Sequence, residues 1–207
     1  MPRDPAARLA LARTDAASGF DQRAWRGFRS ALAAEPEGPL RLAVLVELAD
    51  AAAQRGDALA ASFFAEQARY LGPDHPAVDL VTARIAQRFA PGSPAVAAAW
   101  QRVLDRDGAN VEALVARGVA HLAAGQAVDA LALLQTASGL DPRNPEILYQ
   151  RARALAAAAR YQEAHGLLIE CARLTARPGG DMGLFDRAVR LAQSMQARLV
   201  EGGNGGS

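Results

Sequence analysis

The sequence predicts an all-α protein, an α-solenoid of stacked helical hairpins that ends in a capping helix. Three observations predict this class. Alanine, the residue with the highest helix propensity, is abundant, whereas aromatic residues make up only 5% of the chain. The segments ALVARGVAHLAAGQAVDALALL and ILYQRARALAAAARYQEAHGLL are near-copies of each other. Small and apolar residues also recur at intervals of 34 to 37 residues along the chain, as they do in a protein built of repeats.

Five hairpins follow from this interval. The second helix of each hairpin has a small or apolar anchor, at Ala31, Ala68, Val103, Ala137 and Cys171. The first helix of each has a small residue, at Ala12, Ala49, Ala83, Gly118 and Ala152. Small residues let two helices approach closely, because a larger side chain would push their axes apart. The predicted hairpins cover residues of about 5–38, 42–75, 76–110, 111–144 and 145–178.

The turns between hairpins contain residues that stop one helix and start the next. In GLDPRNPEILY the first proline, Pro142, cannot continue the preceding helix. Asn144 can cap the following helix, which has Pro145 in its first turn. The segment PDHPAVDL, with Pro73 and Pro76, has the same design at an earlier hairpin boundary. These segments therefore predict boundaries between neighbouring hairpins.

The segment 181–200 is predicted to cap the last hairpin, whose apolar side would otherwise face solvent. Asp181 can cap the start of this helix, and polar residues including Arg187 lie mostly away from the apolar face. The apolar face itself has helical spacing and consists of Leu184, Phe185, Ala188, Val189, Ala192, Met195 and Leu199. Residues 202–207 are predicted to form a flexible tail.

Together these features resemble the tetratricopeptide repeat family over residues 5–178, most clearly in the last two hairpins. There Gly118 and Ala130 fill the small positions, Tyr161 is the aromatic that opens the second helix, and LDPRNP is the turn between repeats. The first three hairpins match mainly in their small residues and turns. The resemblance implies a right-handed solenoid that acts in protein–protein binding, as an adaptor, a scaffold or an assembly chaperone.

No residue pattern indicates catalysis, a cofactor or a metal. The three histidines fall at non-equivalent places in different hairpins, and Cys171 is the only cysteine, so we expect neither a metal cluster nor an intramolecular disulfide. The net charge of +1 and the mixing of 23 arginines with 22 acidic residues argue against a nucleic-acid binder. Without a signal sequence or an apolar span, we expect a cytoplasmic protein that does not insert into membranes.

The family's groove-lining positions predict a partner-binding site on the first helices of the hairpins. The resemblance assigns this role to Arg84, Arg88, Val115, Val119, Leu122, Tyr149, Gln150 and Arg153. An apolar floor flanked by arginines suits a protein or peptide segment that is amphipathic with acidic flanks. Two questions stay open: whether the apolar face of residues 111–123 is groove or core, and whether these arginines instead pair with Glu112 and Glu146.

Two other functions also fit the sequence. The chain is alternatively the non-catalytic N-terminal part of a larger bacterial enzyme such as a sulfotransferase or hydroxylase, or a scaffold that self-associates through its apolar groove. In either case no catalytic residue is expected within these 207 residues.

Overall fold

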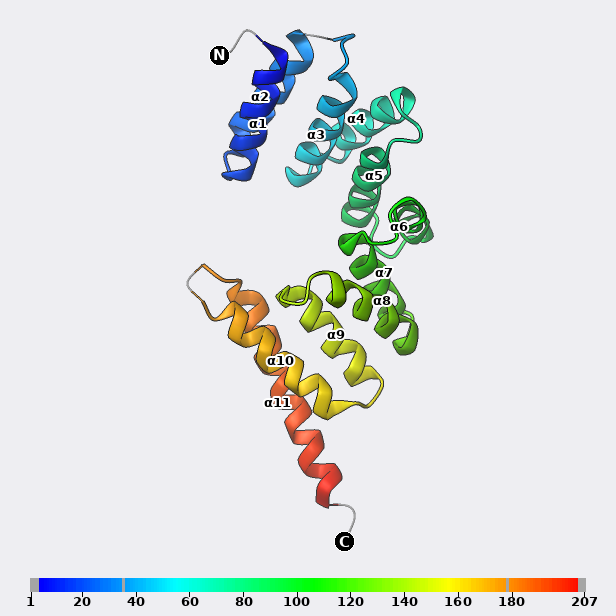
Figure 1. Cartoon of the computed structure of the whole chain (residues 1–207), viewed down its shortest axis with the longest axis vertical. Coiled ribbons are helices and arrows are strands. Elements are labelled where there is room, and N and C mark those ends of the chain that lie inside the picture. The colour runs from blue at the N-terminus through cyan, green and yellow to red at the C-terminus, as the bar shows by residue number, and fades with distance from the viewer. Residues whose placement is uncertain (1–3, 35, 178, 205–207) are drawn as a thin grey trace. The chain divides into compact units, whose positions relative to one another are not determined.

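The computed structural model describes residues 4–34, 36–177 and 179–204, with side chains up to residue 200. All regular elements within these ranges are α-helices (Figure 1). The chain divides into two compact units, Met1–Val103 and Leu104–Ser207. The prediction of an all-α fold of paired helices, with no strand among the described residues, is confirmed.

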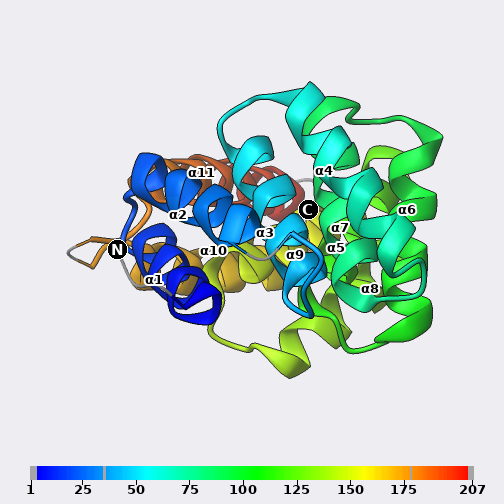
Figure 2. The same ribbon diagram turned by 90° about the horizontal axis from the view of Figure 1, so that it is seen from above.

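The first unit contains two complete hairpins and most of the third. Its helices are α1 (Pro5–Ala17), α2 (Asp21–Ala34), α3 (Arg41–Gln54), α4 (Ala58–Leu71), α5 (Pro76–Phe89) and the greater part of α6 (Pro94–Arg106). Helix α1 lies beside α2 in both Figure 1 and Figure 2. A Cβ on Gly27 would lie only 2.7 Å from the Cβ of Ala12, so α1 and α2 can approach this closely only with glycine at that position.

The second unit continues the pattern with α7 (Val111–Ala123), α8 (Ala127–Leu140), α9 (Pro145–Ala157), α10 (Tyr161–Thr175) and α11 (Met182–Asn204). Helix α7 packs on α8, α9 packs on both α8 and α10, and α11 packs mainly on α10. Gly118 of α7 lies directly against Leu134 of α8. The predicted anchors Ala137 and Cys171 are fully buried, as the repeat interval requires.

Two of the helices that begin with proline are capped by the side chain of the residue before that proline. The Oδ1 of Asn144 accepts hydrogen bonds from the backbone N–H groups of Glu146 (3.1 Å) and Ile147 (3.4 Å), and Pro145 begins α9. At the earlier boundary, Nδ1 of His75 accepts a hydrogen bond from the N–H of Ala77 at 3.2 Å. Each cap satisfies backbone donors that the first turn of a helix leaves without partners.

Helix α11 is longer than the sequence predicts. It is capped by Asp181, whose Oδ1 accepts from the N–H of Leu184 at 2.9 Å, and it runs to Asn204 instead of residue 200. Residues 202–204, predicted as tail, are therefore helical, and residues 205–207 lie outside the described residues. Leu184, Ala188, Ala192 and Met195 are buried in one cluster with residues of α9 and α10.

Candidate partner-binding site

The eight predicted groove residues lie on three helices. Arg84 and Arg88 are on α5 of the first unit. The other six are on α7 and α9 of the second unit: Val115, Val119, Leu122, Tyr149, Gln150 and Arg153. Arg84 and Arg88 therefore belong to a different compact unit from the other six residues.

In the first unit, polar contacts tie the first helix of each hairpin to the next. Nε of Arg13 lies 2.6 Å from Oε1 of Glu47, and these two residues are 34 apart in the sequence. Arg88 donates to the backbone carbonyl of Gln54 at 3.2 Å, again over 34 residues. Nη1 of Arg84 lies 3.5 Å from Oδ1 of Asp50, a third contact at the same separation. The two contacts between the second and third hairpins thus fall at the repeat interval of 34 residues that separates Ala49 from Ala83.

The apolar residues of α7 are shared between core and surface. Val115 and Leu122 pack against the buried cluster of Ala130, Leu134 and Ala154, but both keep part of their surface open to solvent. Val119 is also half-buried. The face is therefore neither a closed core nor a fully exposed groove.

A chain of polar contacts crosses α9 beside this apolar face. The side chain of Gln150 is only 7% exposed; its amide donates to Oε1 of Glu146 and accepts from Nη1 of Arg153 at 2.8 Å. Gln150 was predicted to line the groove, but it is buried, and its two neighbours on the helix satisfy both ends of its amide. It therefore holds Arg153 in position, and Arg153 remains exposed.

Helix α11 contributes an arginine that the groove prediction missed. The guanidinium carbon of Arg187 lies 5.2 Å from the centre of the Tyr149 ring, and Nη2 of Arg187 lies 3.8 Å from Oε2 of Glu146. The sequence places Arg187 away from the apolar face of the capping helix, and its side chain is exposed there. The signal that would have found it is the packing of α11 against α9, which brings Arg187 alongside the exposed residues of α9.

The expected pairing with Glu146 is made by a different arginine. Arg84 pairs with Asp50 within the first unit, and Arg153 reaches Glu146 only through Gln150. The direct ionic neighbour of Glu146 is Arg187. No carboxylate among the described residues pairs directly with Arg153.

Cys171 and two of the three histidines make contacts with neighbouring helix ends or side chains. Burial raises the pKa of the Cys171 thiol to about 11, and the nearby Glu146 carboxylate contributes to the increase; Sγ donates to the carbonyl of Pro145 at 3.2 Å. His121 shares a 2.7 Å hydrogen bond with Gln126, and His75 caps α5. Among the described residues there is no metal-holding group of three histidine, cysteine or acidic side chains. In the same part of the chain, every helix is too short or too polar to cross a membrane.

Comparisons with known proteins agree with this architecture. The sequence model of the tetratricopeptide repeat family matches residues 121–172. No curated protein matches the chain by sequence.

Several solved structures share the fold. A thermophilic tetratricopeptide repeat protein of Thermus thermophilus superposes with a TM-score of 0.70 at 17% identity, covering 90% of this chain and 98% of its own. A tetratricopeptide repeat protein from Parabacteroides merdae gives 0.68 at 15% identity, covering 95% of this chain and 76% of its own. YrrB, described as a tetratricopeptide repeat protein with an unusual peptide-binding site, gives 0.60 at 14% identity, covering 91% of this chain and 93% of its own.

The paired helices, the family match and these superpositions define a helical-repeat protein of the solenoid class. Within that class, residues 121–172 carry the sequence signature of the tetratricopeptide repeat, and the fold of tetratricopeptide repeat proteins extends over most of the chain. Repeats of this family generally serve as protein-interaction modules.

Proposed function

We propose that the second unit binds a segment of a partner protein along α7, α9 and α11. The segment is an amphipathic peptide or helix with acidic side chains beside its apolar face, and the protein acts as an adaptor, a scaffold or an assembly chaperone. The observation that carries the proposal is the grouping of Tyr149 with two arginines from different helices, Arg153 and Arg187, on one surface.

The surface has the composition of a binding centre. Aromatic and arginine side chains next to a desolvated apolar patch contribute most of the energy in typical interfaces. Here Val115 and Leu122 supply the apolar area. Neighbouring side chains already hold both residues in place, so a partner that covers their exposed parts orders few additional side chains. Tyr149 stacked beneath Arg187 supplies a preformed aromatic contact.

The charges on this surface favour an acidic partner. Arg153 is fixed by Gln150 yet has no directly paired carboxylate among the described residues. The contact from Arg187 to Glu146 is long, at 3.8 Å, so a closer carboxylate from a partner can compete for the guanidinium. Charged side chains at the edge of an interface steer association and make it depend on salt.

The likeness to YrrB supports a peptide as the ligand class, since that protein has the same fold and a peptide-binding site. A cytoplasmic location is also part of this proposal, as the sequence predicted.

The test is a titration of a partner captured from the source organism and identified by mass spectrometry. Arg153→Glu is expected to weaken binding by about tenfold, since it replaces an attractive charge by a repulsive one. The matched control is Arg173→Glu on α10, which reverses the same charge beside Glu170 on a different helix. It is expected to bind like the wild type, and the wild-type affinity is expected to fall between low and moderate salt.

Helicity and melting temperature of both variants are measured to show that each remains folded. Including Arg84→Glu reports whether the first unit takes part in binding. Equal affinities for the Arg153→Glu and Arg173→Glu variants would show that the partner docks elsewhere.

A further inference from the structure

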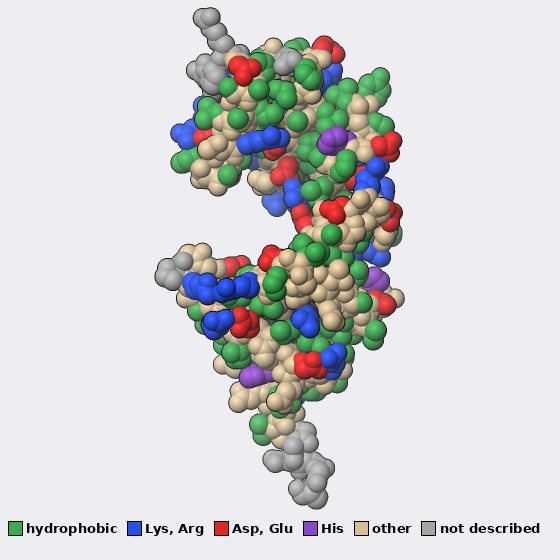
Figure 3. Space-filling model, viewed as in Figure 1, with side chains coloured by type: hydrophobic (Ala, Val, Ile, Leu, Met, Phe, Trp, Pro, Cys, Tyr) green, Lys and Arg blue, Asp and Glu red, His purple; other side chains and the backbone are tan. Residues whose placement is uncertain are grey.

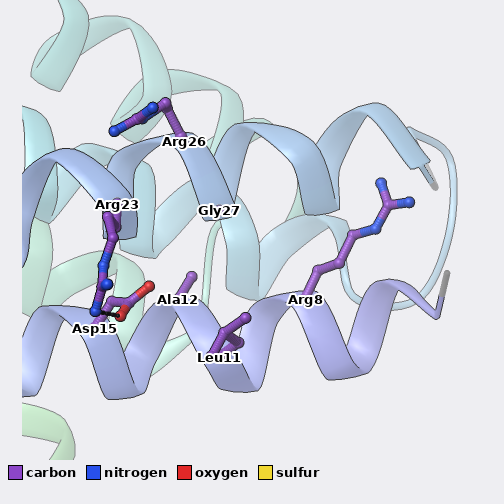
Figure 4. Close-up of a pocket in the computed structure, with 7 residues that line it drawn as sticks. All are labelled: Arg8, Leu11, Ala12, Asp15, Arg23, Arg26 and Gly27. Atoms are coloured by element: carbon purple, nitrogen blue, oxygen red, sulfur yellow. Dashed lines mark hydrogen bonds and ion pairs between the residues drawn. The ribbon is translucent and has the colours of Figure 1, made fainter. Parts of the chain in front are cut away.

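The first hairpin has an open surface on its outer side, along the seam of α1 and α2. A cavity of about 330 Å³ lies there (Figure 4). Its lining residues are Arg8, Leu11, Ala12, Asp15, Arg23, Arg26 and Gly27. We call this surface the leading face. Figure 4 shows Leu11 and Ala12 rising from α1 toward α2, with Arg23 and Asp15 joined at one end and Arg8 at the other.

The equivalent surface is an interface in the next repeat of the same unit. One repeat after Leu11 and Asp15 come Leu48 and Ala52 of α3, and both are 0% exposed. Leu48 packs in the cluster that contains Phe28 of α2, so the preceding hairpin covers it.

The position of Arg8 shows the same pattern in every later hairpin. Its equivalents there are all buried: Leu45, Asp79, Leu114 and Leu148. Leu45 packs against Leu32 of the preceding hairpin. The leading face is therefore built at positions that accept a helix in the next repeat.

Apolar side chains remain exposed at the leading face. Leu11 is 47% exposed, although its equivalent Leu48 is fully buried. Phe20, in the turn between α1 and α2, is 51% exposed and lies under the Arg23 guanidinium, 4.1 Å from the ring centre. A second depression of about 340 Å³ lies beside Phe20 and shares Arg23 with the first.

The charge of the leading face is basic. The cavity has three arginines and one acidic residue, Asp15, which is already paired with Arg23 at 2.8 Å; the depression beside Phe20 adds Asp21 and shares Arg23. Arg26 donates to the Gln22 carbonyl of its own helix at 3.2 Å and has no acidic partner among the described residues. On the face of the molecule that Figure 3 draws, arginines elsewhere lie interspersed with acidic side chains.

The basic charge of the leading face favours an acidic helix as its partner. A second copy docking through its C-terminal helix is disfavoured, because the described side chains of α11 expose Arg187, Arg190 and Arg198 against Asp186 alone. An acidic helix is attracted by the same surface. We propose that the leading face docks an amphipathic helix of a partner protein, with its apolar side on Leu11 and Phe20 and its acidic side chains facing Arg23 and Arg26.

The probe for this proposal comes from the fold itself. Helix α2 (Asp21–Ala34) is the helix that covers the equivalent positions on α3, so a synthetic peptide of that sequence has a suitable apolar side. Two such peptides are made, each held helical by a staple on its solvent-facing side, because an isolated helix of this length is marginal in water. One keeps the native sequence. In the other, the positions of Arg23, Arg26 and Arg29 carry glutamate.

Binding is measured by fluorescence anisotropy with the full-length protein. The acidic peptide is expected to bind at least about tenfold more tightly than the native one. In the protein, Arg26→Glu is expected to weaken the acidic peptide by about tenfold, whereas Arg29→Glu, on the same helix but outside the cavity, leaves it unchanged. Leu11→Asp removes binding, and since Leu11 is half-exposed this variant is expected to stay folded.

Three results would overturn the proposal: no saturable binding of the acidic peptide, equal binding of both peptides, or binding that is indifferent to Arg26→Glu and Leu11→Asp. The last result would instead indicate that the peptide displaces the chain's own α2 from α3. Arg153→Glu is expected to leave peptide binding unchanged, which separates this surface from the site on the second unit.

Discussion

Replacing Gly118 by alanine is expected to destabilise the second unit, although alanine is the better helix former. Gly118 lies in the middle of α7, where the Cβ of an alanine would come within 2.8 Å of Cγ and 3.1 Å of Cδ2 of Leu134. Leu134 is completely buried on α8, so it cannot swing away into solvent. Either its rotamer changes or the two helices move apart.

Two opposing effects set the magnitude. Alanine in place of glycine in a helix interior contributes about 1 kcal/mol of stability. Forcing an extra carbon into a well-packed contact costs about 1–3 kcal/mol. The expected net change for Gly118→Ala is a loss of about 1 kcal/mol, the difference between the middle of that range and the gain in propensity.

Gly166→Ala is the matched control. Gly166 also lies inside a helix of the second unit, α10, but a Cβ there would meet nothing within 4 Å. This variant is expected to gain about 0.5–1 kcal/mol. Urea unfolding followed by circular dichroism measures both variants against the wild type. If both are stabilised equally, the contact between α7 and α8 is looser than the structure shows, and our reasoning about small positions fails.

Two further predictions concern the other end of the second unit. The Cys171 thiol, whose pKa is raised to about 11, is expected to react slowly with a disulfide reagent at pH 8 and rapidly after unfolding. Because the folded protein raises the pKa of the thiol, the thiol's contribution to stability is retained below the ordinary pKa of 9.0 and lost as the pH rises towards 11. Unfolding of the wild type and of Cys171→Ala across this pH range measures that loss. If the stability of both proteins declines in parallel, the raised pKa of Cys171 is refuted. Deleting residues 181–207 uncovers the cluster that holds Leu148, Leu168 and Cys171, so the shortened chain is expected to aggregate or unfold with lower cooperativity and to expose the thiol, whereas deleting 202–207 is expected to have no effect. A monomeric and equally stable 1–180 fragment would show that α11 does not cap the stack.

The repeat interval predicted the buried anchors because every hairpin needs a small or apolar residue where its two helices meet. Ala137 and Cys171 lie where two helices meet in every hairpin, and a small residue is required there whichever side chains surround it. The cap at Asn144 followed in the same way, from local chain geometry near Pro145, whereas the cap at His75 was not predicted. Small residues at helix contacts and prolines in turns recur in each hairpin, so they can be recognised from the sequence.

The candidate site was less predictable because its geometry depends on particular partners. Gln150 was expected on the groove surface, but it is buried, with Glu146 and Arg153 on adjacent turns satisfying both ends of its amide. Arg187 lies away from the apolar face of α11 as the sequence indicates, but its contact with Tyr149 depends on the packing of α11 on α9 and was not predicted. The end of α11 at Asn204 was missed as well, since glycines in the sequence EGGN indicated a tail.

The contacts that link Arg13 to Glu47, Asp50 to Arg84 and Gln54 to Arg88 also bear on how such a gene can change. Repeat genes gain and lose units by unequal recombination, which is harmless only where units are interchangeable. Excision of residues 42–75 would set Arg13 facing the helix that carries Arg84 and Arg88, so attraction would be replaced by repulsion between like charges. Each of the two ion pairs contributes only about 0–1 kcal/mol, but their opposite charges face each other only while the second hairpin lies between the first and the third. The charges of the first three hairpins therefore favour their present order. A chain without the second hairpin would bring the arginines of the first and third hairpins together.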